Sequence, residues 1–344
     1  MTAKRPNVGR TVKLDADKLV AVMNRCGLDV DKLAQRAALS SGTVNNVLAG
    51  KAPYRSTANQ LAKALGVNLD VLLEGTGTPT AAATVHEYLL LDVLTDWITA
   101  SNGLRFQACR MRHLELDRQC RGKRFDLRDL PTDEEQRCRT WIKRHPIVCD
   151  AIGAHPNIVR NFTAFHDPGE GYYWVIDEWV DGVTLLQKLQ RDRFEGEALR
   201  QLMLDIAHGL QALHTHDIIR RELSPASILM WNQDATAVLT DFELAKLIDR
   251  GPTVSTKDWP ADPYRAPEAN GVDVNYAADI YSWGRIAVHA CLGELPESES
   301  ERDRLRDAGL PRRIERLLES AVSPLRGERP SSIDELIPAI EKWG

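Results

Sequence analysis

Three features are missing from the sequence, and each absence excludes a class of protein. None of its apolar runs approaches the roughly 18–20 residues that span a bilayer, so no membrane partner is expected. The N-terminal stretch has no apolar core like that of a signal peptide, which favours a cytoplasmic protein. The six cysteines are scattered without a CxxC pair, which predicts reduced thiols and argues against a zinc site.

Charge is unevenly divided along the chain, although its net value is only −5. Residues 1–75 carry 11 Lys and Arg against 6 Asp and Glu, whereas the remaining residues carry 33 against 43. Hydrophobic residues at 43% and charged residues at 27% are typical of a folded protein and not of a disordered one. A basic segment followed by a larger acidic one suggests that only the first segment meets a polyanion.

The segment GTGTPTAAAT, residues 75–84, separates these two parts. It is small, uncharged and contains Gly and Pro, as is typical of a linker between independently folded parts. A chain of 344 residues is also long for one domain. We therefore expect a helical domain at residues 1–74, a strand-rich lobe at residues 85–180 and a helix-rich lobe at residues 181–344.

The first domain shows helical patterns in short bursts, and five short helices are expected. One of them is predicted in SSGTVNNVLAGK, where a serine precedes the helix Ser41–Leu48. Val44 and Val47 would face inward, and Gly50 would end the helix. The pattern predicts a compact all-α bundle.

The stretch DKLAQRAALSSGTVNNVLAGKAPYRSTANQLAKALGVNLDVLL resembles the helix-turn-helix domain of the phage repressor and Cro-like family. The resemblance implies DNA binding as a homodimer, with Ser41–Leu48 as the recognition helix in the major groove. The residues that would contact bases are Ser41, Gly42, Thr43, Asn45 and Asn46. Lys51 and Arg55, which follow the helix, suit phosphate contacts. The alternative is a module for dimerisation or protein binding, because the helix lacks the strongest base readers, Arg and Gln.

After the linker, the pattern changes from strands to helices. Four segments have the composition of strands: Glu87–Leu94, Arg105–Met111, Asn157–Phe165 and Tyr172–Val180. The strongest helical stripe of apolar residues lies in Ala198–His214. A strand-rich half followed by a helix-rich half predicts a two-lobed α+β domain.

Seven motifs in this part, in order, resemble those of the eukaryotic-type protein kinase fold, over about Val85 to Trp343. They are HPNIV (155–159), VIDEWVDGVTL (175–185), IIRRELSPASIL (218–229), LTDFELAKL (239–247), YRAPE (264–268), AADIYSWGRIAVHACLGELP (277–296) and GERPS (327–331). The resemblance implies a fold built for phosphoryl transfer, whose working parts can be checked position by position.

Several nucleotide-holding positions of that family are altered here. Only Gly103 stands where a glycine-rich loop should approach the phosphates, and Arg110 falls at the position of the strand lysine. The helix glutamate that pairs with this lysine should lie near KRHPIV, which contains no acid. Asp177 falls near the gatekeeper position, where a carboxylate would disfavour adenine.

The catalytic loop and the metal-binding motif are altered as well. By resemblance, Glu222 replaces the aspartate base, Ser224 the lysine and Ser227 the metal-binding asparagine. Asp241 retains the metal-binding aspartate, but Glu243 replaces the glycine of the DFG motif. Glutamate is one methylene longer than aspartate, and the geometry of phosphoryl transfer tolerates little displacement.

The residues that hold the framework match the family. By resemblance, Glu268 and Arg329 form a buried ion pair, and Asp279 orients the backbone of the catalytic loop beside Arg221. The activation segment also contains three hydroxyl residues on which Arg221 could capture an added phosphate, but ordinary loop composition is the favoured explanation for them. They are Thr253, Ser255 and Thr256.

A framework without its catalytic parts indicates a pseudokinase. The favoured hypothesis is a bacterial or phage-encoded DNA-binding regulator whose inactive kinase-like domain senses a signal or binds a protein partner. No cofactor would be required, although Arg110 and Asp241 could hold ATP with or without Mg²⁺. The alternatives are an active atypical Ser/Thr kinase that uses Glu222 as base and Asp241 as metal ligand, and an adaptor without DNA binding in a defence or toxin-control system.

Overall fold

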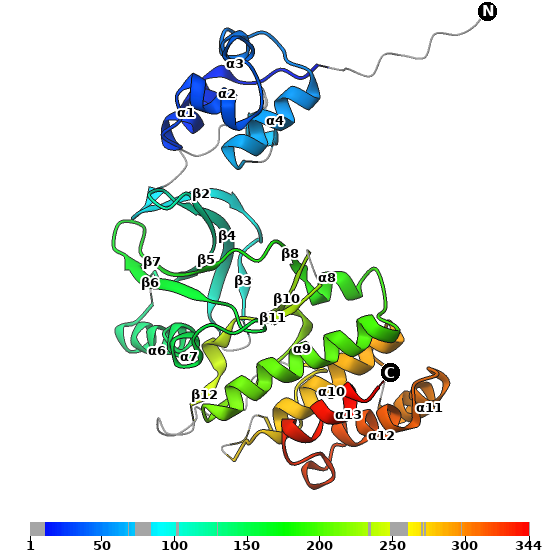
Figure 1. The fold of residues 1–344 in the computed structure, drawn as a ribbon. Helices are drawn as coiled ribbons and strands as arrows, with labels where there is room; N and C mark the ends of the chain where they lie inside the picture. The colour runs from blue at the N-terminus through cyan, green and yellow to red at the C-terminus, as the bar shows by residue number, and fades with distance from the viewer. Residues whose placement is uncertain are drawn as a thin grey trace, which may run out of the picture. The chain divides into compact units, whose positions relative to one another are not determined.

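The computed structural model divides the chain into two compact units (Figure 1). One comprises residues 1–96 and 107–122, and the other residues 97–106 and 123–344. The structure describes residues 11–67, 69–72, 84–100, 103–128, 130–232, 235–247, 261–269, 271, 273–296 and 298–343. Most of the predicted linker, residues 75–83, lies outside these ranges, and Thr84 belongs to a strand.

The described N-terminal residues form short helices, as the bursts of helical pattern predict. These are α1 (Ala16–Arg25), α2 (Val30–Arg36), α3 (Ser41–Leu48), α4 (Arg55–Leu65) and α5 (Leu69–Leu72). The side chain of Ser40 caps α3 by accepting a hydrogen bond of 3.1 Å from the Thr43 amide. Gly66 ends α4 with φ of +69°, a conformation that favours glycine. The inward faces of these helices form one apolar core around Leu19, Leu33 and Leu61.

An antiparallel sheet follows the helices. Its strands are β1 (Thr84–Val85), β2 (Tyr88–Val93), β3 (Ile98–Thr99), β4 (Arg105–His113), β5 (Arg118–Asp126), β6 (Asn161–Asp167) and β7 (Tyr172–Glu178). They are ordered β1-β2-β4-β5-β7-β6, and β3 pairs with the start of β4. The four predicted strands correspond to β2, β4, β6 and β7, but β5 was not predicted.

Two helices, α6 (Thr132–Ile142) and α7 (Arg144–Ile152), connect β5 with β6. Cys138 and Ile142 of α6 pack with Phe125 of β5 and Val175 of β7 in a small apolar core. This packing seats the two helices beside the strands, as predicted for the smaller lobe of a two-lobed α+β domain.

The remainder of the chain is rich in helices, as predicted. Its helices are α8 (Leu185–Leu189), α9 (Gly196–Thr215), α10 (Ala277–Leu292), α11 (Ser298–Asp307), α12 (Arg312–Ala321) and α13 (Ile337–Glu341). Trp283 of α10 is fully buried, and its indole N–H donates to the Met203 carbonyl of α9 at 3.0 Å. Gly284 lets α10 approach α12, because a Cβ there would lie 2.9 Å from that of Ala321.

Short strands and 3₁₀ turns of the larger lobe carry the segments that matter for chemistry. The strands are β8 (Gly182–Thr184), β9 (Ile218–Ile219), β10 (Ile228–Trp231), β11 (Ala237–Leu239) and β12 (Lys246–Leu247). The turns are η1 (Pro225–Ser227), η2 (Phe242–Leu244), η3 (Arg326–Glu328) and η4 (Ile333–Glu335). Antiparallel pairing of β10 with β11 and of β9 with β12 places the loop after β9 beside the segment that follows β11.

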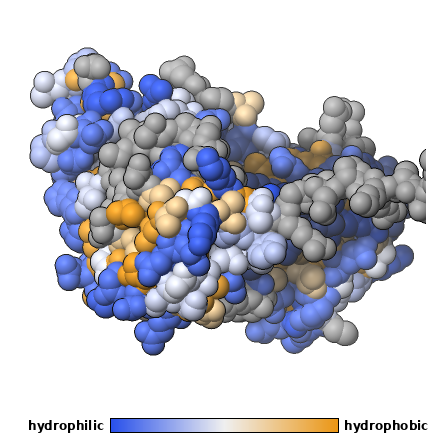
Figure 2. All heavy atoms as spheres, turned by 90° about the horizontal axis from the view of Figure 1, so that it is seen from above, coloured by the Kyte–Doolittle hydropathy of each residue, from blue (hydrophilic) through white to orange (hydrophobic). Residues whose placement is uncertain are grey.

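The surface seen in Figure 2 is mostly hydrophilic, with hydrophobic residues gathered in smaller groups. Over the described ranges, none of the helices has the length and apolar character needed to cross a membrane.

Candidate functional site

The loop between β9 and β10 is held in shape by one buried carboxylate. Asp279 of α10 is 0% exposed, and its two oxygens accept the backbone N–H groups of Arg220 and Arg221 at 2.8 Å each. His214 of α9 lies 2.9 Å from the same side chain. Arg221 adopts a φ of +64°, which this pair of hydrogen bonds maintains. The loop therefore keeps a defined turn that presents Glu222.

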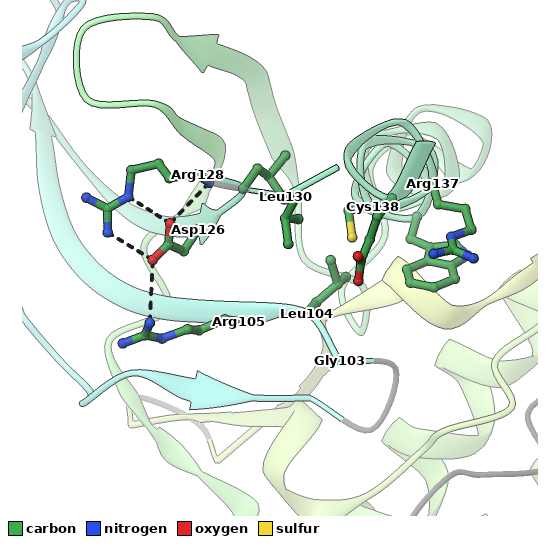
Figure 3. A pocket seen from close by; sticks show the side chains of 11 residues that line it. Gly103, Leu104, Arg105, Asp126, Arg128, Leu130, Arg137 and Cys138 are labelled. Atoms are coloured by element: carbon green, nitrogen blue, oxygen red, sulfur yellow. Dashed lines mark hydrogen bonds and ion pairs between the residues drawn. The ribbon is translucent and has the colours of Figure 1, made fainter. Parts of the chain in front are cut away.

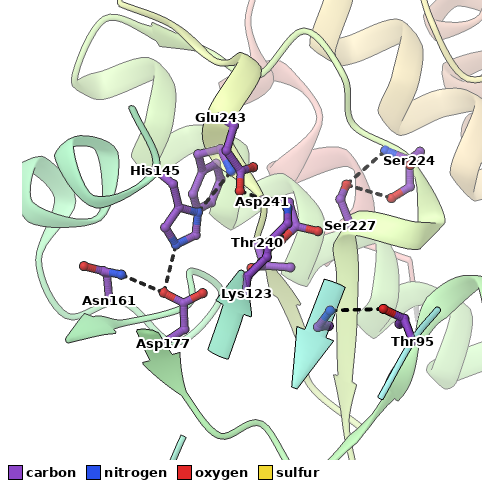
Figure 4. Close-up of polar contacts among 12 residues, drawn as sticks. Thr95, Lys123, His145, Asn161, Asp177, Ser224, Ser227, Thr240, Asp241 and Glu243 are labelled. Atoms are coloured by element: carbon purple, nitrogen blue, oxygen red, sulfur yellow. Dashed lines mark hydrogen bonds and ion pairs between the residues drawn. The ribbon is translucent and has the colours of Figure 1, made fainter. Parts of the chain in front are cut away.

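The polar side chains of this loop contact one another and a neighbouring arginine. Arg265 donates a hydrogen bond to the Glu222 carboxylate, and the two side chains are only 6% and 14% exposed. The Ser227 hydroxyl donates to the Ser224 carbonyl at 3.0 Å and accepts from the Ser224 amide at 3.3 Å. Both serines thus close a local turn, which Figure 4 shows.

Lys123 of β5 lies at the centre of the polar cluster in Figure 4. Its ammonium is 3.2 Å from Asp241 Oδ1 and 2.9 Å from Glu243 Oε1. The Phe106 ring lies below it at 4.1 Å from the ring centroid, a cation–π distance. The Lys123 side chain is 5% exposed, and a lysine is buried to this extent only when it is paired. Asp241 has φ of +63°, so its carboxylate turns toward β5 at the start of η2.

The prediction that Arg110 stands at the lysine position is wrong. Arg110 lies on β4 and donates to the Asp92 carboxylate of β2, with an Nε–Oδ2 distance of 2.8 Å. The residue beside Asp241 is Lys123, one strand later. The error arose because β5 was missed, since RQCRGKRFD mixes charges with few apolar residues. The available signal was the turn at Leu114–Asp117, which separates β4 from a second strand.

The predicted absence of an acid in KRHPIV corresponds to a buried histidine. His145 of α7 lies 2.9 Å from Asp177, and its Nδ1 accepts the Phe242 amide hydrogen at 3.1 Å. Asp177, at 1% exposure, also accepts from Asn161 at 2.9 Å, so its carboxylate is hydrogen-bonded inside the lobe. Burial disfavours the charged imidazole, but the Asp177 carboxylate and the Cys149 side chain together outweigh it and raise the pKa of His145. The hydrogen bond from the Phe242 amide favours the neutral imidazole instead, because it needs an Nδ1 without a proton.

The same geometry is matched by known proteins. The family described as protein kinase domain matches residues 122–339, well over half of the chain. The chain belongs to the protein kinase domain family.

Relatives and a solved structure agree with this assignment. The chain is 27% identical over 179 residues to serine/threonine-protein kinase C of Synechocystis, covering 48% of this chain and 33% of that protein. It is 30% identical over 180 residues to serine/threonine-protein kinase PknF of Mycobacterium tuberculosis, covering 49% and 36%. It therefore spans about a third of the length of these curated relatives. The PknI kinase domain of M. tuberculosis has a similar fold, with a TM-score of 0.56 at 19% identity, covering 76% of this chain and 97% of that one.

Arg329 and Glu268 form the ion pair that the resemblance implies, although the Glu268 side chain is 25% exposed. Arg329, whose side chain is 0% exposed, donates from Nη2 to Glu268 at 3.0 Å and from Nη1 to the Ala277 carbonyl at 3.0 Å. Arg221 donates to the Ala269 carbonyl at 2.9 Å. These bonds tie the end of the activation segment to α10. Thr253, Ser255 and Thr256 lie outside the described residues.

Mg-ATP, the reactant of the family, fits this site only in part. Lys123 and Asp241 are the residues that would hold phosphate and Mg²⁺, and the buried cation between carboxylates suits a phosphate group. Ser227, at the second metal position, already uses its hydroxyl in the turn with Ser224. Within the part of the chain that the structure describes, no group of three or more His, Cys, Asp or Glu could hold a metal ion. Gly103, with φ of +84°, forms the turn before β4.

A hollow lies beside this turn, with a volume of about 390 Å³ (Figure 3). Leu104, Leu130 and Trp141 line it together with charged side chains. Asp126 accepts from Arg128 at 2.8 Å, and hydrogen bonding to Arg128 lowers the pKa of Asp126, opposed by burial. Asp126 is thus already paired with Arg128 and Arg105 within the wall of the hollow.

The residues predicted to contact DNA lie on α3 and just after it. Gly42, Asn45 and Asn46 are exposed, Ser41 and Thr43 are half-buried, and Lys51 and Arg55 are exposed. Three of these side chains make local contacts. They are Ser41 with Asp31 at 2.6 Å, Thr43 with Ser40 at 2.9 Å, and Asn46 with Lys51 at 2.9 Å.

Proposed function

We propose that the chain is a cytoplasmic regulator whose kinase domain binds a purine nucleoside triphosphate and transfers its phosphoryl group slowly or not at all. The observation that carries the proposal is the buried contact of Lys123 with Asp241. They correspond to the lysine and the metal-binding aspartate that hold the phosphates and the metal in kinases. A lysine buried this far must be paired with an opposite charge. The relatives named above support the kinase class of ligand.

Slow transfer follows from the state of the catalytic loop. A general base must reach the proton that it removes, and the Glu222 carboxylate is instead engaged by Arg265. The second metal position is occupied by Ser227, whose hydroxyl bonds to Ser224. Nucleotide binding would therefore serve as a signal, transmitted to a protein partner or to the N-terminal helices.

The test is a comparison of binding with transfer on the full chain. Mg-ATP should raise the melting temperature by several degrees, because a ligand that binds only the folded state stabilises it. Incubation with radiolabelled ATP should give no transfer above that of a heat-treated sample. If neither ATP nor adenosine changes the melting temperature of the wild type, nucleotide binding is refuted.

Active transfer is the second candidate, and the intact pair of Lys123 with Asp241 favours it. In that case Glu222 would act as base once a substrate hydroxyl displaces Arg265. Glu222→Ala and Asp241→Ala should then each abolish a clear wild-type signal. Transfer that is present in the wild type and lost in both variants would replace the regulator proposal by this one.

The N-terminal helices are proposed to bind DNA as a dimer. Support comes from the exposed Asn45 and from the exposed cations Lys51 and Arg55 that follow α3. Binding to DNA from upstream of its own gene should weaken with salt, and Lys51→Ala should reduce the magnitude of the logarithmic salt slope by about 0.9. Lys63→Ala, which removes an exposed lysine of α4, is the matched control and should leave the slope unchanged. Equal affinity for specific and random DNA would contradict sequence-specific binding.

A further inference from the structure

The Glu243 carboxylate that pairs with Lys123 comes from a segment position where the kinase family has no acid. Kinase activity requires the strand lysine to form an ion pair with a glutamate of the helix that follows. The two helices after β5 approach the Asp241–Glu243 segment with His145 and not with an acid. The carboxylate beside Lys123 belongs to Glu243, at the glycine position of the DFG motif.

We propose that Glu243 is the positioning residue that orients Lys123 toward the nucleotide phosphates, in place of the missing helix glutamate. The inference rests on the proposed nucleotide binding and names the residue that makes this binding selective for phosphate.

The contact has the geometry of a functional ion pair. The Lys123 ammonium donates to Glu243 Oε1 at 2.9 Å, between residues 120 positions apart in the chain. The two side chains are 5% and 7% exposed, so both charges have left water. Such burial is costly unless the two charges satisfy each other, and a glycine at this position would leave Lys123 with Asp241 alone.

The pair leaves donor capacity for a ligand. An ammonium has three N–H donors. In the described part of the chain, Lys123 contacts the carboxylates of Asp241 and Glu243, and the Phe106 ring lies below it. One N–H therefore remains for a phosphate oxygen, and the two carboxylates fix the direction in which it points.

His145 contacts the Asp241–Glu243 segment from the helix where kinases carry the glutamate. Its ring stacks on Phe242 with centroids 5.4 Å apart and accepts the Phe242 amide hydrogen. The helix therefore contacts the Asp241–Glu243 segment through an imidazole, and the segment contacts the lysine through a carboxylate. The lysine keeps its carboxylate partner, although the helix no longer provides it.

A purely structural pair would neutralise Lys123 without affecting ligand selectivity. The two roles differ in what they do to two ligands. A positioning role affects ligands with phosphates and spares adenosine, because Lys123 meets only the phosphates. A structural role lowers the affinity for both ligands together or for neither.

The experiment is titration calorimetry of the full chain with Mg-ATP and, separately, with adenosine. E243Q should lower the affinity for Mg-ATP about tenfold, equivalent to about 1.4 kcal/mol, and leave that for adenosine within about twofold. E243D, which retains the charge, should recover part of the loss. K123Q should show the same selectivity, and the K123Q/E243Q double variant should lose less than the sum of the two single losses.

The control is E135Q, which removes a carboxylate that pairs with Arg139 on α6 at 2.7 Å in a more exposed position. It should bind both ligands as the wild type does. Melting temperatures of all variants identify any that fail to fold, and E243D then carries the comparison.

Two outcomes overturn the inference in distinguishable ways. If the wild type binds neither ligand, the proposed nucleotide site fails, and the positioning role fails with it. If the wild type binds Mg-ATP, and E243Q either binds it equally well or loses ATP and adenosine in equal measure, the positioning role alone is refuted.

Discussion

The surroundings of Lys123 and the catalytic loop have departed from the kinase pattern in opposite ways. Around Lys123 a lost helix glutamate is matched by a new carboxylate, Glu243, within hydrogen-bonding distance of the lysine. In the loop, Glu222 and Ser227 make contacts of their own, with Arg265 and Ser224. One region has substituted for its missing part, whereas the other has used its altered residues to hold its own shape. The proposed function therefore combines a half that holds phosphate with a half that does not transfer it.

The largest effect that would break this comparison is removal of the buried cation. Lys123→Met leaves the Asp241 and Glu243 carboxylates facing each other in a buried site. We expect a loss of about 3–5 kcal/mol in the free energy of unfolding. Urea unfolding followed by circular dichroism measures it. A loss below about 1 kcal/mol would mean that the pair does not carry the stability of this region.

A gain of activity would test whether the catalytic loop alone limits phosphoryl transfer. Glu222→Asp, Ser224→Lys and Ser227→Asn together restore the base, the lysine and the metal-binding asparagine of the family. If the Lys123 half is competent, phosphoryl transfer from radiolabelled ATP should rise about 100-fold, equivalent to about 2.7 kcal/mol. The same triple change on a Lys123→Met background should give no gain. A triple variant as inactive as the wild type would show that the Lys123 half is also deficient.

The N-terminal helices should respond to a single exposed side chain. Asn45→Ala removes a side chain that could read adenine, so it should cost about 1–3 kcal/mol on specific DNA and leave binding to random DNA unchanged. Asn59→Ala, in an exposed position of α4, is the matched control. Fluorescence anisotropy at fixed salt measures both. Equal weakening on specific and random DNA would place Asn45 outside the base-reading surface.

The smallest effect is expected at the arginine first assigned to the lysine position. Arg110→Met breaks a half-buried pair with Asp92, whose two side chains are 23% and 21% exposed. Such pairs contribute about 0–1 kcal/mol, so the urea midpoint should barely move. Mg-ATP should still raise the melting temperature. Loss of that response in Arg110→Met would return the phosphate role to Arg110.

Local pattern predicted the elements that have strong local signals. The helix Ser41–Leu48 has the predicted bounds because a capping serine and inward valines mark it within a few residues. β5 was missed because its buried positions Cys120, Gly122 and Lys123 fall on both faces of the strand and do not form an apolar alternation. The error in β5 then moved the lysine assignment one strand too early.

Contacts between distant segments could not be read from the sequence. In the sequence Glu243 is only a replacement of the DFG glycine, and the fold alone brings it to a lysine 120 positions away. The contact of Glu222 with Arg265 likewise joins residues 43 positions apart. In both cases the partner depends on packing that no spacing rule encodes.

The origin of the two carboxylates around Lys123 has a consequence for control of the domain. When the glutamate sits on the helix, rotating the helix outward separates it from the lysine, and this movement can serve as an off switch. Here both carboxylates belong to the three-residue segment Asp241–Glu243, which α7 contacts through His145, so a movement of α7 would act on Lys123 through this segment. A signal that separates Lys123 from its carboxylates would therefore have to move the Asp241–Glu243 segment itself.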